Sequence, residues 1–169
     1  MGSKRGAQGP VHIRRNLDTF SDPYLLEQTG TERSVCTTCG AVYQNKRWYI
    51  DMELTEAQRV KTNKVLCPAC KKIADRLPGG VVTLEGKFLR KHKDEILHLI
   101  HNEEKRARGF NPLERIIQMN DRNGSLEITT TTEKLAQRIA RMVHKAYAGE
   151  VDYKWSEDVK FVRAHWRRD

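Results

Sequence analysis

Two short stretches, Cys36-Thr37-Thr38-Cys39-Gly40 and Cys67-Pro68-Ala69-Cys70, decide the fold of the first half of this chain. They hold all four cysteines of the 169-residue sequence, in two Cys-x2-Cys pairs. Gly40 follows the first pair, where a positive φ would let the backbone turn beneath a metal ion. Four thiolates in two close pairs match a tetrahedral metal site, so the spacing predicts a metal-binding module.

Zinc is the metal that such a set of ligands favours, because Zn²⁺ accepts tetrahedral geometry and binds soft sulfur tightly. A shell of four cysteines leaves no position for water, so we expect one structural Zn²⁺ and no metal catalysis. The predicted ligands are Cys36, Cys39, Cys67 and Cys70. Two disulfides and a mononuclear iron site are the alternatives. Residues 1–10 are polar and basic and do not resemble a signal peptide, so we expect a reducing, cytoplasmic location, which disfavours disulfides.

The composition favours a soluble globular protein with an anionic partner. Hydrophobic residues make up 38% of the chain and charged residues 31%, and no apolar run approaches the roughly 20 residues of a membrane span. Basic residues outnumber acidic ones by 31 to 22, a net charge of +9. Residues 34–79 and residues 80–169 each hold four more basic than acidic residues, so the excess lies in the predicted folded parts. This balance favours a polyanionic partner such as nucleic acid or an acidic membrane surface, and of these we expect nucleic acid and no membrane.

The chain divides into three predicted segments. Residues 1–33 are rich in glycine and proline and read as a flexible basic N-terminal arm. Residues 34–79 form a four-cysteine zinc-ribbon module, with short strands at 41–43 and 47–50, a helix over 56–63 and another over 71–77. Thr55 and Gln58 fit a capping box for the first of these helices. A module this small needs the metal for much of its folding free energy.

Residues 80–169 read as an α/β domain in the order β-α-β-β-α-β-β. Strands are expected at 81–84, 113–120, 125–130, 151–155 and 159–166, with helices over 87–108 and around Leu135–Ala146. Asn123-Gly124 is a strong hairpin signal. This order predicts a ferredoxin-like (split βαβ) sheet with both helices on one face and a final edge strand, so the fold class is α+β. A KH-like order and a looser α+β sandwich are the alternatives.

Basic residues near aromatic ones are the candidates for nucleic-acid contacts. One cluster lies between the two cysteine pairs, where alternation along a strand leaves either Trp48 or Tyr49 exposed for stacking on a base. A second forms a ridge on the helix after the Asn-Gly turn, and a third alternates with apolar residues on the last strand. The predicted nucleic-acid-binding residues are Lys46, Arg47, Trp48, Tyr49, Arg138, Arg141, Arg163 and Arg167. No catalytic arrangement of residues stands out, so we expect neither an enzyme nor a small-molecule substrate.

From the cysteines onward, the chain resembles the nonsense-mediated-decay family of large-ribosomal-subunit export adaptors, and most of all a short bacterial relative. The likeness rests on the Cys-x2-Cys-Gly and Cys-Pro-x-Cys motifs and on Asp121-x-Asn123-Gly124-x-Leu126-x-Ile128. A helix with Ala136, Ile139 and Ala140, followed by Gly149, continues it. The family has more cysteine pairs and, in eukaryotes, C-terminal extensions for nuclear export, so export does not transfer. The resemblance implies association with ribosomal RNA or the large ribosomal subunit.

These observations predict a non-catalytic zinc-binding protein that binds structured RNA on the ribosome or an assembling subunit. The alternative is a zinc-ribbon transcriptional regulator that binds DNA or a polymerase subunit. A preference for structured RNA over duplex DNA at matched salt separates the two.

Overall fold

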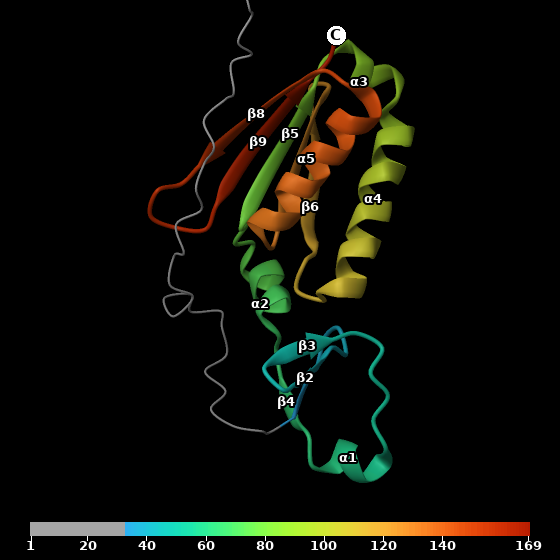
Figure 1. Cartoon of the computed structure of the whole chain (residues 1–169), viewed down its shortest axis with the longest axis vertical. Coiled ribbons are helices and arrows are strands. Elements are labelled where there is room, and N and C mark those ends of the chain that lie inside the picture. Colours follow the sequence, from blue (N-terminus) through green and yellow to red (C-terminus); the bar gives the residue numbers. More distant parts are fainter. Residues whose placement is uncertain (1–32) are drawn as a thin grey trace, which may run out of the picture.

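The computed structural model describes residues 33–169, and the predicted arm before Arg33 lies outside them. Within this part, the chain forms two sheets with helices, an α+β protein (Figure 1). No helix among the described residues combines the length and the apolar composition that a membrane span requires.

The first unit is a small four-stranded sheet with the order β3-β2-β1-β4. Its strands are β1 (Ser34–Cys36), β2 (Val42–Gln44), β3 (Arg47–Tyr49) and β4 (Asn63–Val65). The tight β2–β3 turn is made by Asn45 and Lys46, both with positive φ, at 52° and 62°. Two helices complete the unit, α1 (Glu56–Val60) and α2 (Pro68–Asp75).

Two details of this unit differ from the sequence prediction. Helix α1 has the expected Thr55–Gln58 capping box but ends at Val60, and the residues after it form β4, parallel to β1. Helix α2 begins at Pro68, inside the second cysteine pair, and not at residue 71. Proline is well suited to the first position of a helix because that position needs no backbone N–H donor, so the motif itself starts the helix.

The second unit is a five-stranded sheet with the order β6-β7-β5-β9-β8. Its strands are β5 (Gly80–Glu85), β6 (Ile116–Arg122), β7 (Ser125–Thr130), β8 (Glu150–Trp155) and β9 (Val162–Arg167). The predicted first helix is divided at His92 into α3 (Lys87–Lys91) and α4 (Lys93–Phe110), and α5 (Glu133–Tyr147) follows β7. Helices α4 and α5 lie on the same face of the sheet (Figure 1).

The predicted ferredoxin-like sheet is not confirmed. Strands β5, β6 and β7 follow the split βαβ order, but β9, expected as the final edge strand, lies inside the sheet between β5 and β8. It pairs parallel to β5 and antiparallel to β8, which therefore forms the edge. Burial explains the placement: the inward residues of β9 are almost completely buried, whereas β8 alternates exposed charged residues with half-buried ones. Charged side chains protect an exposed edge from pairing with another chain.

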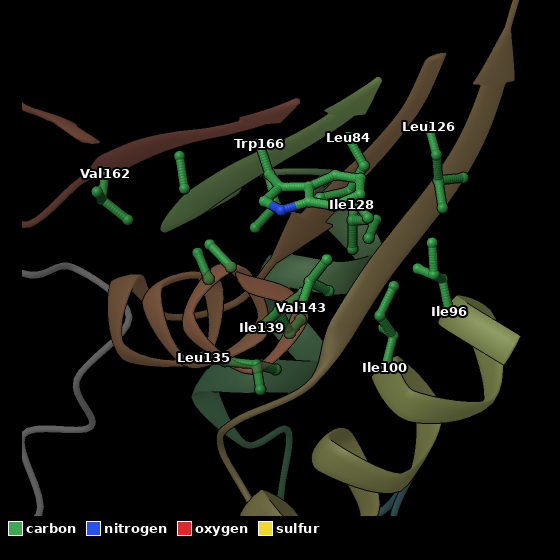
Figure 2. Packing of buried hydrophobic residues seen from close by; sticks show 14 of the residues in the cluster. Leu84, Ile96, Ile100, Leu126, Ile128, Leu135, Ile139, Val143, Val162 and Trp166 are labelled. Atoms are coloured by element: carbon green, nitrogen blue, oxygen red, sulfur yellow. The ribbon is translucent and has the colours of Figure 1, made fainter. Parts of the chain in front are cut away.

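The core of this unit lies between the sheet and helices α4 and α5, as Figure 2 shows. Trp166 of β9 is its largest fully buried side chain. The indole Nε1–H of Trp166 donates a hydrogen bond of 2.7 Å to the carbonyl of Ala148, so its polar atom is satisfied inside the core. Branched residues from the sheet and both helices surround it, among them Leu84, Ile96, Ile100, Ile128, Leu135, Ile139 and Val143.

The two units are in contact through the loop between α4 and β6 and through α2. Leu113 of the loop packs against the cysteine cluster. The Lys72 amino group donates to the carbonyl of Thr131 at 3.3 Å, and the Arg47 guanidinium donates to the carbonyl of Phe110 at 3.2 Å. The connecting Gly79 is packed as well: a Cβ there would lie 2.5 Å from the carbonyl oxygen of Thr131.

Candidate metal centre

The four cysteines come from two local structures that face each other. Cys36 ends β1 and Cys39 follows in the turn, while Cys67 is the N-cap of α2 and Cys70 lies in its first turn. Their four sulfur atoms lie within 4.8 Å of one another, and none forms a disulfide. Three of the four residues are buried, and Cys39 is half-buried. The spacing prediction therefore agrees with the structure, which brings these thiols together.

Backbone and side-chain donors surround the sulfur atoms. The backbone N–H of Cys67 donates to Cys36 Sγ at 3.3 Å, and that of Cys70 donates to Cys67 Sγ at 3.4 Å. From the second unit, Arg115 Nη1 approaches Cys70 Sγ at 3.5 Å. Such outer donors orient ligands and partly neutralise the negative charge of a thiolate cluster. The site is therefore completed by a residue from outside its own sheet.

Contacts among the thiols and burial shift the pKa values of three of them in different directions. A hydrogen bond with Cys67 lowers the pKa of Cys39 to about 4, and the same contact raises the pKa of Cys67. Burial raises the pKa of Cys70 to about 11. Thiolates packed this closely repel one another, so a bound cation is what would allow the cluster to carry four negative ligands at neutral pH.

The four cysteines are a metal-ligand set compatible with a zinc ribbon. A shell of four cysteine ligands is complete without water, which is typical of structural sites. The arrangement can brace β1, the β2–β3 hairpin and α2 against one another, since each contributes or adjoins a ligand.

The predicted nucleic-acid residues of the hairpin separate into two faces. Trp48 is 7% exposed and belongs to the apolar cluster around the cysteines. Tyr49 is half-buried, with the Arg47 guanidinium 5.6 Å from its ring centre. Lys46 and Arg47 are both exposed at and beside the turn. Of the two aromatic residues considered for stacking, Tyr49 is the more accessible.

The two predicted arginines of α5 have different surroundings. Arg141 is exposed, together with Lys134 and Lys145. Arg138 instead forms an ion pair with Glu114 and lies 3.7 Å from Glu103, and both of these carboxylates have side chains that are only 4% exposed. Burial raises the pKa of Glu114, and the positive charge of Arg138 opposes that rise. The guanidinium of Arg138 is thus engaged within the protein.

On β9, Arg163 and Arg167 lie on the sheet face opposite the helices, as their alternation with apolar residues predicted. Acidic neighbours balance the charge of Arg167: Glu150 lies in register with it, and Asp169 forms an ion pair with it at 3.0 Å. Arg163 instead lies in register with Lys154. His165, between the two arginines, lies 3.0 Å from a Glu85 carboxylate oxygen. This face therefore carries both signs of charge.

Sequence reasoning missed three contributors around the metal centre and the hairpin. Arg115 and Leu113 reach the cysteine cluster from the second unit, and Phe110 accepts the Arg47 hydrogen bond at the end of α4. No local pattern marks them, because each lies far along the chain from the cysteine or hairpin residue that it meets. The one signal in the sequence was a phenylalanine, Phe110, at the end of an otherwise polar stretch of predicted helix.

Comparisons with known protein families, with curated proteins and with solved structures found no match to this chain. The fold and the site together define an α+β protein with mixed sheets and a four-cysteine candidate metal site.

Proposed function

We propose that this chain is a non-catalytic, zinc-dependent RNA-binding protein that associates with the ribosome or its large subunit. One structural Zn²⁺, held by the four cysteines, would brace the unit that carries the β2–β3 hairpin. The observation that carries the proposal is the exposed pair Lys46 and Arg47 on that hairpin, directly beside the cysteine cluster. The net charge of +9 favours the same class of partner.

The proposed phosphate contacts are the exposed basic residues: Lys46, Arg47, Arg141, Arg163 and Arg167. We assign Arg138 to folding, because its guanidinium pairs with the buried Glu114 carboxylate and lies near that of Glu103. Tyr49 supplies an accessible ring, while Trp48 supports the metal unit from within. The charge-balanced face of the five-stranded sheet is the weaker part of this surface, since Glu150 and Asp152 lie in register with Arg167 and His165.

Fluorescence anisotropy with a labelled RNA hairpin and a DNA duplex of matched length tests the proposal over a series of salt concentrations. We expect tighter binding to the RNA, weakening steeply as salt rises, because phosphate contacts release counterions. Arg141→Ala should weaken binding and lower the slope of log K against log salt by about one unit. Arg106→Ala, which removes an exposed arginine of α4 outside the proposed surface, is the matched control.

Three results would count against parts of this proposal. An unchanged salt slope for Arg141→Ala would remove that residue from the interface. Equal or tighter binding to the DNA duplex would favour the transcriptional-regulator alternative. Absence of binding to either nucleic acid would contradict the proposal as a whole.

A further inference from the structure

A hollow of about 360 Å³ lies between the β2–β3 hairpin and the C-terminal end of α4. Figure 1 shows this end of α4 above β3. The two units share its walls, with side chains from Tyr43, Lys46, Arg47, Trp48, Phe110 and Asn111. The volume falls within the range of about 300–1,000 Å³ that is typical of pockets for small organic groups. The hollow is thus large enough for a planar ring system and exists only when the units are held together.

Aromatic rings form much of its lining. Tyr43 and Trp48 are opposite each other on the hairpin, with ring centres 5.3 Å apart and planes tilted by 52°. Trp48 is held in place by its packing against the cysteine cluster. Phe110 is 67% exposed, and it is the one aromatic among the exposed large hydrophobic residues of the described chain. An exposed ring at the rim of an aromatic hollow offers a stacking surface for a second planar group.

The charge at the rim is positive. Lys46 and Arg47 are exposed there, and neither forms an ion pair with another residue of the described 33–169 segment. The hydrogen bond from Arg47 Nη2 to the Phe110 carbonyl holds the guanidinium beside the hollow. A planar group that also carries negative charge therefore complements this site better than a neutral apolar one. A nucleotide combines both properties, since its base is aromatic and its phosphate anionic.

We propose that this hollow binds one unpaired nucleotide of the RNA partner, with the base against Phe110 and Tyr43 and the phosphate beside Lys46 and Arg47. This inference rests on the proposed function and adds a specific preference to it. Proteins recognise single-stranded loops by stacking unpaired bases on aromatic rings. A base that is paired within a stem does not have a free face for such stacking. The site would select an RNA with an unpaired base next to a stem, and it would need both units in place.

An RNA hairpin with 2-aminopurine in its loop tests the inference, because the fluorescence of this base falls when it stacks on a ring. The control RNA carries the same base within the paired stem. We expect the metal-loaded full chain to quench the loop probe much more than the stem probe. Phe110→Ala should abolish the difference and weaken binding to the loop RNA by about 5- to 150-fold, the range for losing one base–aromatic stack. Val60→Ala, at a position that is 81% exposed on α1, should bind like the parent protein.

The outcomes separate the two proposals. If the Phe110→Ala variant quenches the loop probe and binds the RNA as strongly as the parent protein does, the proposed nucleotide site is contradicted. The proposal of RNA binding would then still stand. Failure of the parent protein to bind either hairpin overturns both proposals. A further arm uses AMP as competitor: displacement of the hairpin at AMP concentrations similar to those of RNA would show a free-nucleotide site and contradict the RNA assignment.

Discussion

At the scale of single residues, Arg138, Glu103 and Glu114 form a cluster in which an arginine compensates the charge of buried carboxylates. Both carboxylates are almost completely buried, and one guanidinium faces them from α5. A buried carboxylate without a partner is costly, so the arginine is needed where two helices and the α4–β6 loop meet. A residue that appeared in the sequence as part of a basic surface ridge therefore pairs with buried carboxylates, although its own side chain is 35% exposed.

Replacing Arg138 by Gln should destabilise the protein by about 3–5 kcal/mol at pH 7, because both carboxylates lose their compensating charge. The loss should shrink as the pH falls below 7. Burial raises the pKa of Glu114 in the folded protein, and losing Arg138 raises it further, so the folded state gains relative stability at low pH and loses it as the pH rises through that pKa.

Urea unfolding of the variant and of the parent at each pH measures the difference in their free energies of unfolding. Because both proteins are compared at the same pH, any loss of metal in acid affects both. Arg141→Gln, on the exposed face of the same helix, should change stability by less than about 0.5 kcal/mol. An equally large loss for Arg138→Gln at both ends of the pH range would show that the buried carboxylates are not its cause.

At the level of helices and strands, the two units differ in what stabilises them. The five-stranded sheet has its own core around Trp166, whereas the strands of the small sheet are three residues long and meet around the cysteines. Removal of the metal by a chelator should therefore expose the backbone of β1–β4 and α2 to hydrogen exchange and leave β5, β7 and β9 protected.

Hydrogen-exchange mass spectrometry with and without chelator measures this directly. Cys67→Ser should resemble the chelated protein without any chelator, while Thr37→Ser, a change at an exposed position between two ligands, should retain the parent pattern. Unchanged protection over residues 34–75 after chelation would show that the small unit folds without metal.

Local sequence signals predicted where the helices and strands lie better than they predicted which strands pair in the sheet. The Asn123-Gly124 turn has the positive φ values, 54° and 81°, that its sequence implies. The alternation of β9 correctly placed Val162, Ala164 and Trp166 on the buried face. Alternation reveals which face is buried but not which strand lies alongside, so the insertion of β9 between β5 and β8 could not be read from it.

The candidate site was also predictable only in its local part. Cysteine spacing identified the ligand set, because ligands within a pair are local in sequence. The partners that complete the surroundings are not local: Arg115 meets Cys70, and Phe110 meets Arg47, across the junction of the two units. Strand alternation required one of Trp48 and Tyr49 to face inward, and only the packing of the cluster shows that it is Trp48.

In the molecule as a whole, the contacts between the units make the metal site and the basic hairpin parts of one structure. Arg115 and Leu113 support the cysteine cluster, and the hairpin in turn contacts the end of α4. The proposed RNA binding therefore requires the intact, metal-loaded chain. The proposed binding partner is the large ribosomal subunit.

The most direct test is sedimentation of the purified, metal-loaded protein through sucrose gradients with isolated large or small ribosomal subunits, at low and at high salt. We expect co-migration with the large subunit at low salt, reduced by Lys46→Ala/Arg47→Ala and lost as salt rises. If the protein stays at the top of the gradient with both subunits at low salt, the ribosomal assignment is contradicted.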